Sequence, residues 1–256
     1  ERFLKGSAAA ALADPGMASA AKANVVVGQA KAAVEEMFAN PEKKENFVRT
    51  EAVAANQVAL LMKEPLALEH MLKIQDYDKT TYQHSVNVAT ISIGLANSLG
   101  APKEVCQAVG TGALLHDIGK RPTAAPGSTD GSEQPKEVYK SIDAMTQEER
   151  DLYLAHPRMG AGALQGKKYI SKDVLDIILL HEERLDGKGF PSGLKKLDQI
   201  FQLVGLANLY DRQVTLLGST PQKAYDSILA MRPLPYDEDL VSGLKDVLVA
   251  NKILQA

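Results

Sequence analysis

The chain has 256 residues, of which 45% are hydrophobic and 24% are charged, a composition typical of globular proteins. Its formal net charge of −3 argues against a general binding surface for DNA or for an anionic membrane, and no apolar run approaches the roughly 18 residues of a membrane-spanning helix. Tryptophan is absent and aromatic residues make up only 5%, which favours packed helices over sheets. The single Cys106 excludes a disulfide within the chain and fits a reducing compartment, so we expect a cytoplasmic protein.

The first quarter of the chain is rich in alanine and predicts two helices, at about 17–38 and 47–63, separated by Asn40-Pro41. This part contains no histidine and no motif that we can interpret. We therefore expect residues 1–64 to form a small helical accessory or interaction region, and residues 65–256 to form the main domain.

From Pro65 onward the hydrophobic spacing predicts helices and no convincing strand. Thr146 and Glu149 match a capping box at a helix start, and Gly100 and Gly119 stand where helices are expected to end. A stretch rich in proline, glycine and serine precedes Thr146, and loops of that length are usually lids or disordered segments. The predicted helices span about 66–74, 82–99, 103–118, 146–156, 172–182, 195–213, 221–231 and 237–252. The predicted fold is therefore an all-α bundle.

Four of the five histidines fall on the buried faces of predicted helices. Apolar residues recur at helical spacing from His84, from His116 and from His181. His156 stands directly before Pro157, where helices tend to break. Each of the four lies near a helix end, so their side chains are expected to point into one shared region.

A metal site explains these inward histidines better than separate structural roles do. Asp117 and Glu182 directly follow two of them, and burying such groups without partners costs several kcal/mol each. Imidazole and carboxylate ligands without thiolate suit iron, manganese, zinc, nickel or cobalt rather than calcium. The fifth histidine, His70, is expected to have no role in this site.

The adjacent pair His116-Asp117 suggests two metal ions rather than one. An aspartate beside a histidine can bridge two ions while the imidazole binds one of them, and ions about 3.5–4 Å apart can activate a shared hydroxide. Lys120 is placed to reach a phosphate as a point charge, although a solvated lysine after a helix cap is the alternative. Asp117 and Lys120 are thus the candidate catalytic residues.

Four segments, taken in order, resemble the HD-GYP family, the HD-domain phosphohydrolases that hydrolyse the bacterial messenger cyclic di-GMP. They are "DYDKTTYQHSVNVA", "LLHDIGK", "MTQEERDLYLAHPRMGAGAL" and "HEERLDGKGFPSGL", and the resemblance runs from about Leu66 to Leu229. It implies an HD-domain helical bundle around a centre of two or three metal ions, often iron. Matched by position, the implied metal ligands are His84, His116, Asp117, His156, His181, Glu182 and Asn208. The implied substrate contacts are Lys120, Lys188, Gly189, Phe190 and Pro191.

The chain also departs from the family pattern. Glu182 replaces the second histidine of the HHE triplet, Asn208 replaces a late aspartate, and Phe190 replaces the tyrosine of the GYP motif. The RPYR-like substrate segment is missing, and "LLGSTPQ" occupies its place. Thr80 stands where some members have an acidic ligand of a third metal, which argues for two ions.

The first functional hypothesis is a metal-dependent phosphodiesterase that opens cyclic di-GMP in bacterial signalling. It uses two divalent transition-metal ions, with iron as the first choice and manganese or zinc as alternatives. The second is a receptor of the same fold that binds metal or nucleotide and signals through partners without efficient turnover. Cyclic di-GMP or a related nucleotide is the expected ligand in both cases. Signalling proteins and a second copy of the chain are candidate partners, and DNA is not.

Overall fold

The computed structural model describes residues 2–74, 81–120 and 142–255, with side chains from residue 8 onward. All regular structure in these ranges is helical, which confirms the predicted all-α class. Thr80 and most of the stretch between Lys120 and Thr146 lie outside the described residues. The α-helices are α1 (Arg2–Ala13), α2 (Ser19–Ala39), α3 (Lys44–Lys63), α4 (Ala67–Lys73), α5 (Thr81–Ser98), α6 (Lys103–Leu115), α7 (Gln147–Leu164), α8 (Lys172–Leu180), α9 (Gln199–Asp211), α10 (Pro221–Ala230) and α11 (Glu238–Ala250). Three shorter segments are η1 (Ile118–Lys120), η3 (Ile142–Ala144) and the π-helix η4 (Arg212–Leu216).

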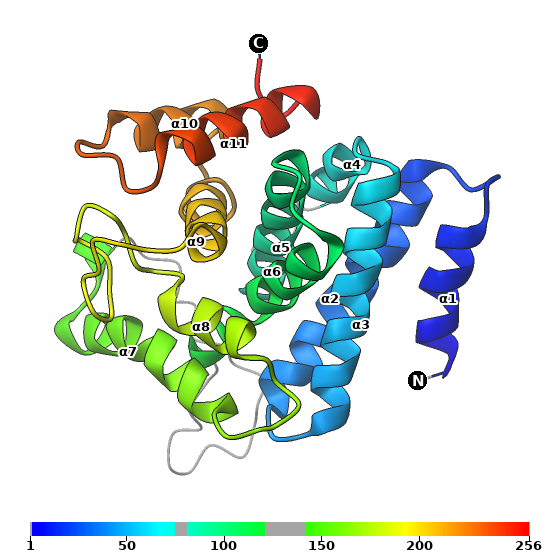
Figure 1. Cartoon of the computed structure of the whole chain (residues 1–256), viewed down its shortest axis with the longest axis horizontal. Helices are drawn as coiled ribbons and strands as arrows, with labels where there is room; N and C mark the ends of the chain where they lie inside the picture. Colours follow the sequence, from blue (N-terminus) through cyan, green and yellow to red (C-terminus); the bar gives the residue numbers. More distant parts are fainter. Residues whose placement is uncertain (1, 75–80, 121–141, 256) are drawn as a thin grey trace.

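Helices α5 and α6 lie at the centre of the molecule and pack against each other (Figure 1). Helices α2 and α3 flank them on one side, α7 and α8 lie on the other, and α10 and α11 close one end. Most residues of α5 are buried, as expected for a helix that is surrounded on all sides. Helix α9 packs against α5 and α8, so the central region is enclosed by α5, α6, α7, α8 and α9.

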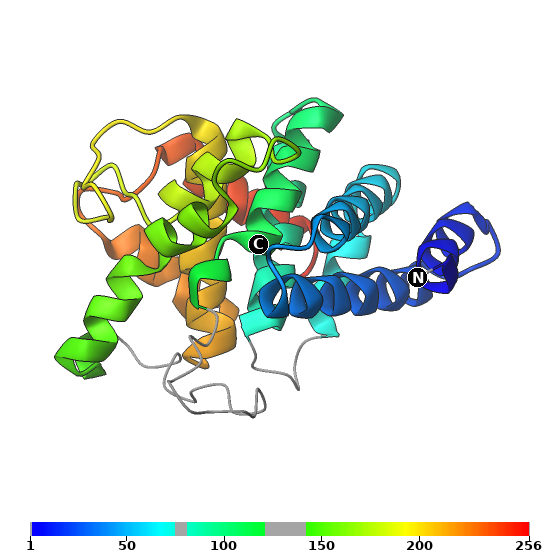
Figure 2. The ribbon, with the colours of Figure 1, turned by 90° about the horizontal axis from the view of Figure 1, so that it is seen from below.

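The N-terminal helices join the same core. Figure 2 shows α1 at the outer edge of the molecule, next to α2. Helix α1 was not predicted, because few large apolar residues in its sequence mark a buried face. The buried residues of α2 and α3 belong to one continuous hydrophobic core with those of α4, α5 and α6. The boundary between residues 64 and 65 remains a prediction.

Two predicted helix ends are wrong, and both lie at the site described below. Helix α7 does not stop before Pro157 but continues to Leu164. Helix α6 ends at Leu115, and Gly119 follows within η1, where it does not have the left-handed conformation of a helix-ending glycine. Gly100, by contrast, has a φ of 76° and ends α5 as predicted.

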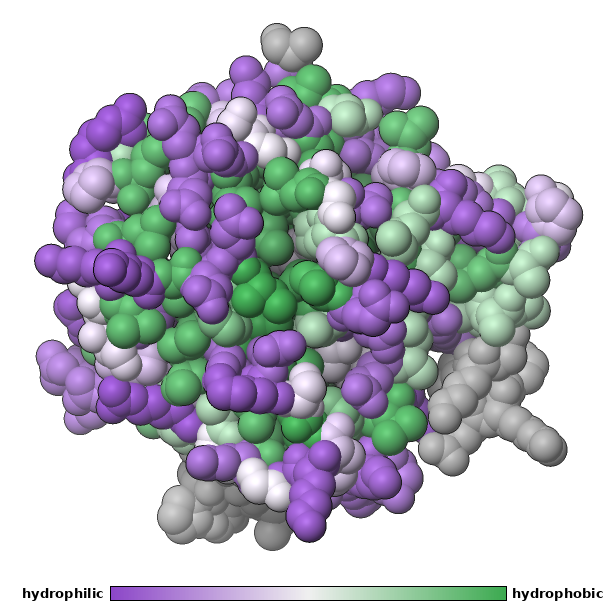
Figure 3. Space-filling view, viewed as in Figure 1, coloured by the Kyte–Doolittle hydropathy of each residue, from purple (hydrophilic) through white to green (hydrophobic). Residues whose placement is uncertain are grey.

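The surface on one side of the molecule mixes polar and apolar residues, with apolar side chains gathered near the middle of that face (Figure 3). Among the described helices, none combines the length and apolar character that crossing a membrane requires.

Candidate metal centre

The four predicted histidines meet in the interior. His84 comes from the first turns of α5, His116 and His181 immediately follow α6 and α8, and His156 lies within α7. Each of them is at most 1% exposed. The ring centroid of His116 lies 5.2 Å from that of His84 and 4.9 Å from that of His181, which in turn lies 5.0 Å from that of His156. His70 lies on α4 and belongs to neither of the candidate ligand clusters.

The backbone fixes the orientation of three of these rings. The last four carbonyl groups of a helix have no partner within it, and His116 Nδ1 and His181 Nδ1 lie 2.7 and 2.8 Å from two such groups, those of Ala113 and Ile178. A carbonyl oxygen only accepts, so each Nδ1 carries a proton, and in the neutral form of the ring the lone pair is on Nε2. This is the tautomer that a metal-binding imidazole needs at Nε2.

Pro157 provides the same arrangement for the third ring. Proline has no N–H, so the carbonyl of Tyr153, four residues earlier, loses its helical hydrogen bond. His156 Nδ1 donates to that carbonyl instead. The proline that was expected to break α7 therefore frees the acceptor that orients His156. Burial lowers the pKa of His156 from 6.5 to about 4, so the ring is neutral near pH 7.

The fourth ring is oriented by a carboxylate that the sequence analysis missed. His84 Nδ1 donates to Asp211 Oδ2 at 2.7 Å, which leaves His84 Nε2 as the metal-facing atom. Asp211 Oδ1 accepts from Asn87 Nδ2 at 2.8 Å and from Thr215 Oγ1 at 2.9 Å. A signal was available in the sequence, because Asp211 lies three residues after Asn208 and so on the same side of α9.

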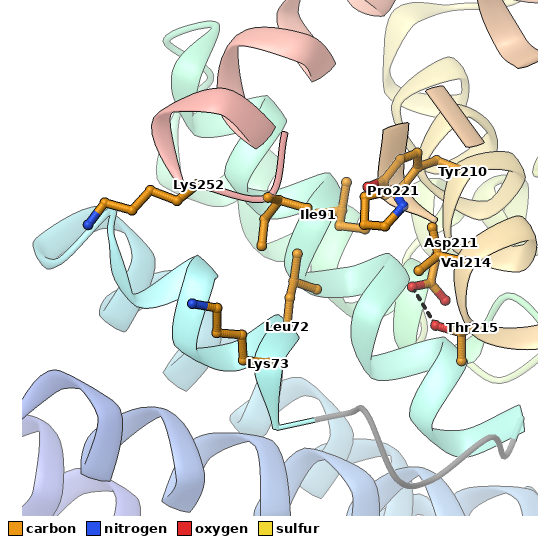
Figure 4. A pocket seen from close by; sticks show the side chains of 10 residues that line it. Leu72, Lys73, Ile91, Tyr210, Asp211, Val214, Thr215, Pro221 and Lys252 are labelled. Atoms are coloured by element: carbon orange, nitrogen blue, oxygen red, sulfur yellow. Dashed lines mark hydrogen bonds between the residues drawn. The ribbon is translucent and has the colours of Figure 1, made fainter. Parts of the chain in front are cut away.

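Asp211 also lines a cavity of about 350 Å³ (Figure 4). Asp211 and Thr215 line it together with apolar residues that include Leu72, Ile91 and Val214. The hydrogen bond between Asp211 and Thr215 lies at the wall of this cavity. The carboxylate that orients His84 is thus next to a partly open cavity lined by α4, α5, the end of α9, η4, the start of α10 and the residues after α11.

Asp117 lies between the two pairs of imidazoles. Its Oδ2 is 3.4 Å from His116 Nε2 and 3.8 Å from His84 Nε2. Its Oδ1 is 3.3 Å from His156 Nε2 and 3.7 Å from His181 Nε2. Each carboxylate oxygen therefore faces one histidine pair. Two groups of possible ligands result, His84 with His116 and Asp117, and Asp117 with His156 and His181, and Asp117 is common to both.

Two glycines allow this close approach. A Cβ on Gly119 would lie 1.9 Å from the carbonyl oxygen of His156, so only glycine brings η1 this close to α7. A Cβ on Gly112 would lie 2.7 Å from Ile177, where α6 packs on α8. The glycine two residues after Asp117 thus serves the contact that brings Asp117 to His156.

The donor set fits divalent transition-metal ions. His156 Nε2 and His181 Nε2 lie 2.9 Å apart, and when both rings are neutral with the proton on Nδ1, two lone pairs face each other there. Two nitrogens that bind one ion at about 2.1 Å each lie about 3 Å apart when they are at right angles. His116 Nε2 is buried and has no hydrogen-bond partner in the described part of the chain. A cation is the group that such atoms lack.

Lys120 compensates the charge of Asp117. Its Nζ lies 2.8 Å from the Asp117 carboxylate, and its side chain is only 7% exposed, so it is not a solvated lysine. Burial alone would raise the pKa of Asp117, but His116 and Lys120 outweigh burial and hold that pKa well below its usual range. Asp117 is therefore anionic, the form in which a carboxylate can bind a metal ion.

Asn208 and Glu182 occupy different positions relative to these clusters. Asn208 Oδ1 lies 3.0 Å from His84 Nε2, beside the first cluster. Glu182 belongs to neither cluster, and its Oε1 accepts from Tyr153 Oη at 2.6 Å. Burial would raise the pKa of Glu182, but His181 and Arg212 lower it to about 2. The roles of both residues as metal ligands remain predictions.

The loop that contains Gly189-Phe190-Pro191 is held against the site by Glu183, the residue after Glu182. This carboxylate is fully buried and accepts from the backbone N–H groups of Ser192 at 2.6 Å and Leu194 at 2.8 Å. The Phe190 ring lies 6.0 Å from the ring of His156. Lys188 is exposed. Of the predicted substrate contacts 188–191, Phe190 thus lies beside His156, and the roles of all four in binding substrate remain predictions.

The family model for the HD domain matches residues 67–240. The chain belongs to the HD-domain family. A solved structure of Bd1817, described as an HDG"Y"P protein from Bdellovibrio bacteriovorus, is 31% identical and covers 96% of this chain and 78% of its own, with a TM-score of 0.84. The resemblance to HD-GYP proteins found in the sequence is thereby confirmed.

Curated relatives of this HD-domain protein carry names that state an activity. The cyclic di-GMP phosphodiesterase PA4108 of Pseudomonas aeruginosa is 30% identical over 213 residues, which cover 82% of this chain and 46% of that protein. The cyclic di-GMP phosphodiesterase response regulator RpfG of Xanthomonas campestris is 32% identical over 133 residues, or 50% of this chain and 31% of that protein. The chain therefore spans less than half the length of these relatives.

Proposed function

We propose that the protein is a metal-dependent phosphodiesterase that hydrolyses cyclic di-GMP. The observation that carries this proposal is the position of Asp117, whose two oxygens each face a different pair of imidazole Nε2 atoms. The names of the curated relatives support the substrate. Two divalent ions are the proposed cofactors, with iron as the first choice and manganese or zinc as alternatives.

The proposed ligands are His84, His116, Asp117, His156 and His181, with Asn208 beside His84. Bound at two such positions, divalent ions would supply a nucleophilic hydroxide at neutral pH and stabilise charge on the phosphoryl oxygens. Hydrogen bonds at Nδ1 orient the four rings and leave Nε2 as the metal-binding atom of each neutral imidazole. The four rings are thus held in place by protein groups before an ion binds, as a preorganised site requires.

Lys120 is the proposed contact to the phosphate. Its ammonium group is held 2.8 Å from Asp117 and so lies beside the bridging position. A phosphate that reaches this position meets a positive charge in a region that excludes most water, where the attraction is stronger than in solvent. The rings of Phe190 and Tyr153, 5.4 Å apart, provide the apolar wall on the His156 side.

The test is a turnover assay on protein reconstituted with iron or manganese, using cyclic di-GMP, its linear dinucleotide and a generic phosphodiester. We expect cyclic di-GMP to be opened, and Asp117→Asn to abolish the reaction. A wild type that holds both metals and binds cyclic di-GMP without hydrolysing any of the three compounds would instead establish the receptor hypothesis. Hydrolysis of the generic compound alone would show that the substrate assignment is wrong.

A further inference from the structure

Arg212 is placed beside the metal centre by a rare turn of helix. It is the first residue of the π-helix η4, and π-turns are frequently found at functional sites. The preceding residue, Asp211, reaches His84, whereas Arg212 reaches Tyr153 on α7. Two consecutive side chains therefore connect the end of α9 to both halves of the centre.

The guanidinium group of Arg212 is held in place by protein groups that engage only some of its N–H donors. Its Nη1 donates to Tyr153 Oη and lies 4.0 Å from Glu182 Oε1, and its Cζ lies 4.7 Å from the centre of the Tyr153 ring. The side chain is 14% exposed. A guanidinium group has five N–H donors, and among the described residues Tyr153 is the acceptor that it contacts. Most of its donors remain available for a ligand.

Tyr153 holds Glu182 and Arg212 in place through its hydroxyl group. Its hydroxyl donates to Glu182 at 2.6 Å and accepts from Arg212. Burial and the Glu182 carboxylate raise the pKa of Tyr153 well above its ordinary value, so the hydroxyl keeps the proton that it donates. Because the ring of Tyr153 lies 5.4 Å from the ring of Phe190, Tyr153 provides a phenol close to the motif position from which the hydroxyl is missing.

A second positive charge approaches the same ring. Lys120 Nζ lies 5.1 Å from the centre of the Tyr153 ring, and Arg212 Cζ lies 4.7 Å from it. The two cationic groups are thus at most about 10 Å apart. Their carboxylate neighbours are Asp117 and Glu182, which face the metal clusters and Tyr153, respectively. The His156 side of the centre therefore presents two partly buried cations.

We propose that Arg212 is a specificity-determining residue that binds a phosphate of the dinucleotide, with Tyr153 as its positioning residue. This inference rests on the proposed function and deepens it. The RPYR-like segment expected after α9 is missing from this chain. Arg212, in the π-helical turn that directly follows α9, supplies a guanidinium group instead. A planar guanidinium group can bind a phosphate through two parallel hydrogen bonds, which a lysine cannot.

The experiment measures equilibrium binding by calorimetry to protein reconstituted with metal. The probes are a phosphorothioate analogue of cyclic di-GMP, which resists hydrolysis, and inorganic phosphate. Arg212→Gln is expected to weaken the binding of the analogue by about 10- to 100-fold, the effect of losing a charge-assisted hydrogen bond. Arg212→Lys, which keeps the charge but loses the planar group, should recover part of that loss. Tyr153→Phe, which keeps the ring, should weaken binding by less than Arg212→Gln.

Arg49→Gln is the matched control, because Arg49 is 15% exposed and also pairs with a carboxylate, that of Glu36, where α3 packs against α2. We expect this variant to bind like the wild type. Wild-type affinity in Arg212→Gln with full metal content would overturn the proposal, and so would a loss of metal, which would assign Arg212 to the centre itself. If Arg212→Gln does not fold, Arg212→Lys decides by the same criterion.

The two proposals fail in different ways. A wild type that binds the analogue but hydrolyses nothing refutes the phosphodiesterase and leaves the Arg212 comparison decisive. A wild type that binds phosphate but not the analogue refutes the dinucleotide, and with it the specificity assigned to Arg212.

Discussion

Replacing Asp211 with asparagine tests whether the residue behind His84 controls one metal position. The Asp211 carboxylate accepts three hydrogen bonds, from His84 Nδ1, Asn87 Nδ2 and Thr215 Oγ1, at 2.7, 2.8 and 2.9 Å. An asparagine of the same shape has one oxygen, which can still accept from Asn87 and Thr215. Its NH₂ group then faces the N–H of His84, and two donors oppose each other.

The expected consequence is a loss of metal affinity rather than of folding. His84 either loses its orienting hydrogen bond or moves its proton to Nε2, the atom that faces the metal. Loss of such an outer partner typically costs 10- to 100-fold in metal affinity, which corresponds to about 1.4–2.8 kcal/mol. Because His84 belongs to only one of the two clusters, one ion should be weakened and the other retained.

The measurement is a metal titration against a competing chelator, fitted with two binding steps, together with thermal unfolding of the metal-free protein. Thr215→Val is the matched control, because it removes a donor to Asp211 and leaves the His84 contact in place. It should change metal affinity by much less than Asp211→Asn, since Thr215 contacts the Asp211 oxygen that does not bind His84 and so acts on the ring only indirectly. Equal weakening of both ions, or equal effects of the two substitutions, would refute the reasoning.

Three further predictions concern the same centre. Asp117→Ala should remove more metal than His116→Ala, because Asp117 serves both clusters; elemental analysis that finds one ion retained in Asp117→Ala and none in His116→Ala would exclude the bridge. Lys120→Ala should keep near wild-type metal content while the rate of hydrolysis or the nucleotide affinity falls, and loss of metal would assign Lys120 to the centre. In metal-free folded protein, His156 stays neutral down to about pH 4, whereas in the unfolded chain it has its ordinary pKa of 6.5. Its contribution to the free energy of unfolding is therefore complete above pH 6.5 and is lost as the pH falls towards 4. The free energy of unfolding measured in urea should decrease by about 3 kcal/mol over this range. His156→Gln should make this decrease smaller, and the same pH dependence in the wild type and the variant would contradict the prediction.

The helices and the inward direction of the histidines could be predicted from the sequence. Apolar residues at helical spacing from His84 mark the side of α5 that packs inward, and such a side must be buried whatever its partners are. The same holds for His116 and His181, which follow α6 and α8 in the structure as well. Local spacing alone therefore determined that these imidazoles point to the interior.

The fate of Pro157 could not be predicted from local rules. A proline within a helix leaves one carbonyl without a partner, which usually ends or kinks the helix. Here the side chain of His156 donates a hydrogen bond to that carbonyl, and Gly119 of η1 packs against the same turn. The cost of the proline is offset by contacts that exist only once α7, η1 and the metal centre are assembled.

Tertiary structure also decided which carboxylates serve which role. Glu182 follows the proposed ligand His181 in sequence, yet its carboxylate is bound by Tyr153, 29 residues away. Asp211 appears in no motif that we assigned, yet it orients His84, 127 residues away. Spacing along a helix reports only which face a side chain occupies, whereas a hydrogen bond depends on the element packed against that face. The sequence by itself determined the all-α class and the histidines of the centre, and only the packing of α5, α7, α8 and α9 decided how those histidines are oriented and which acids surround them.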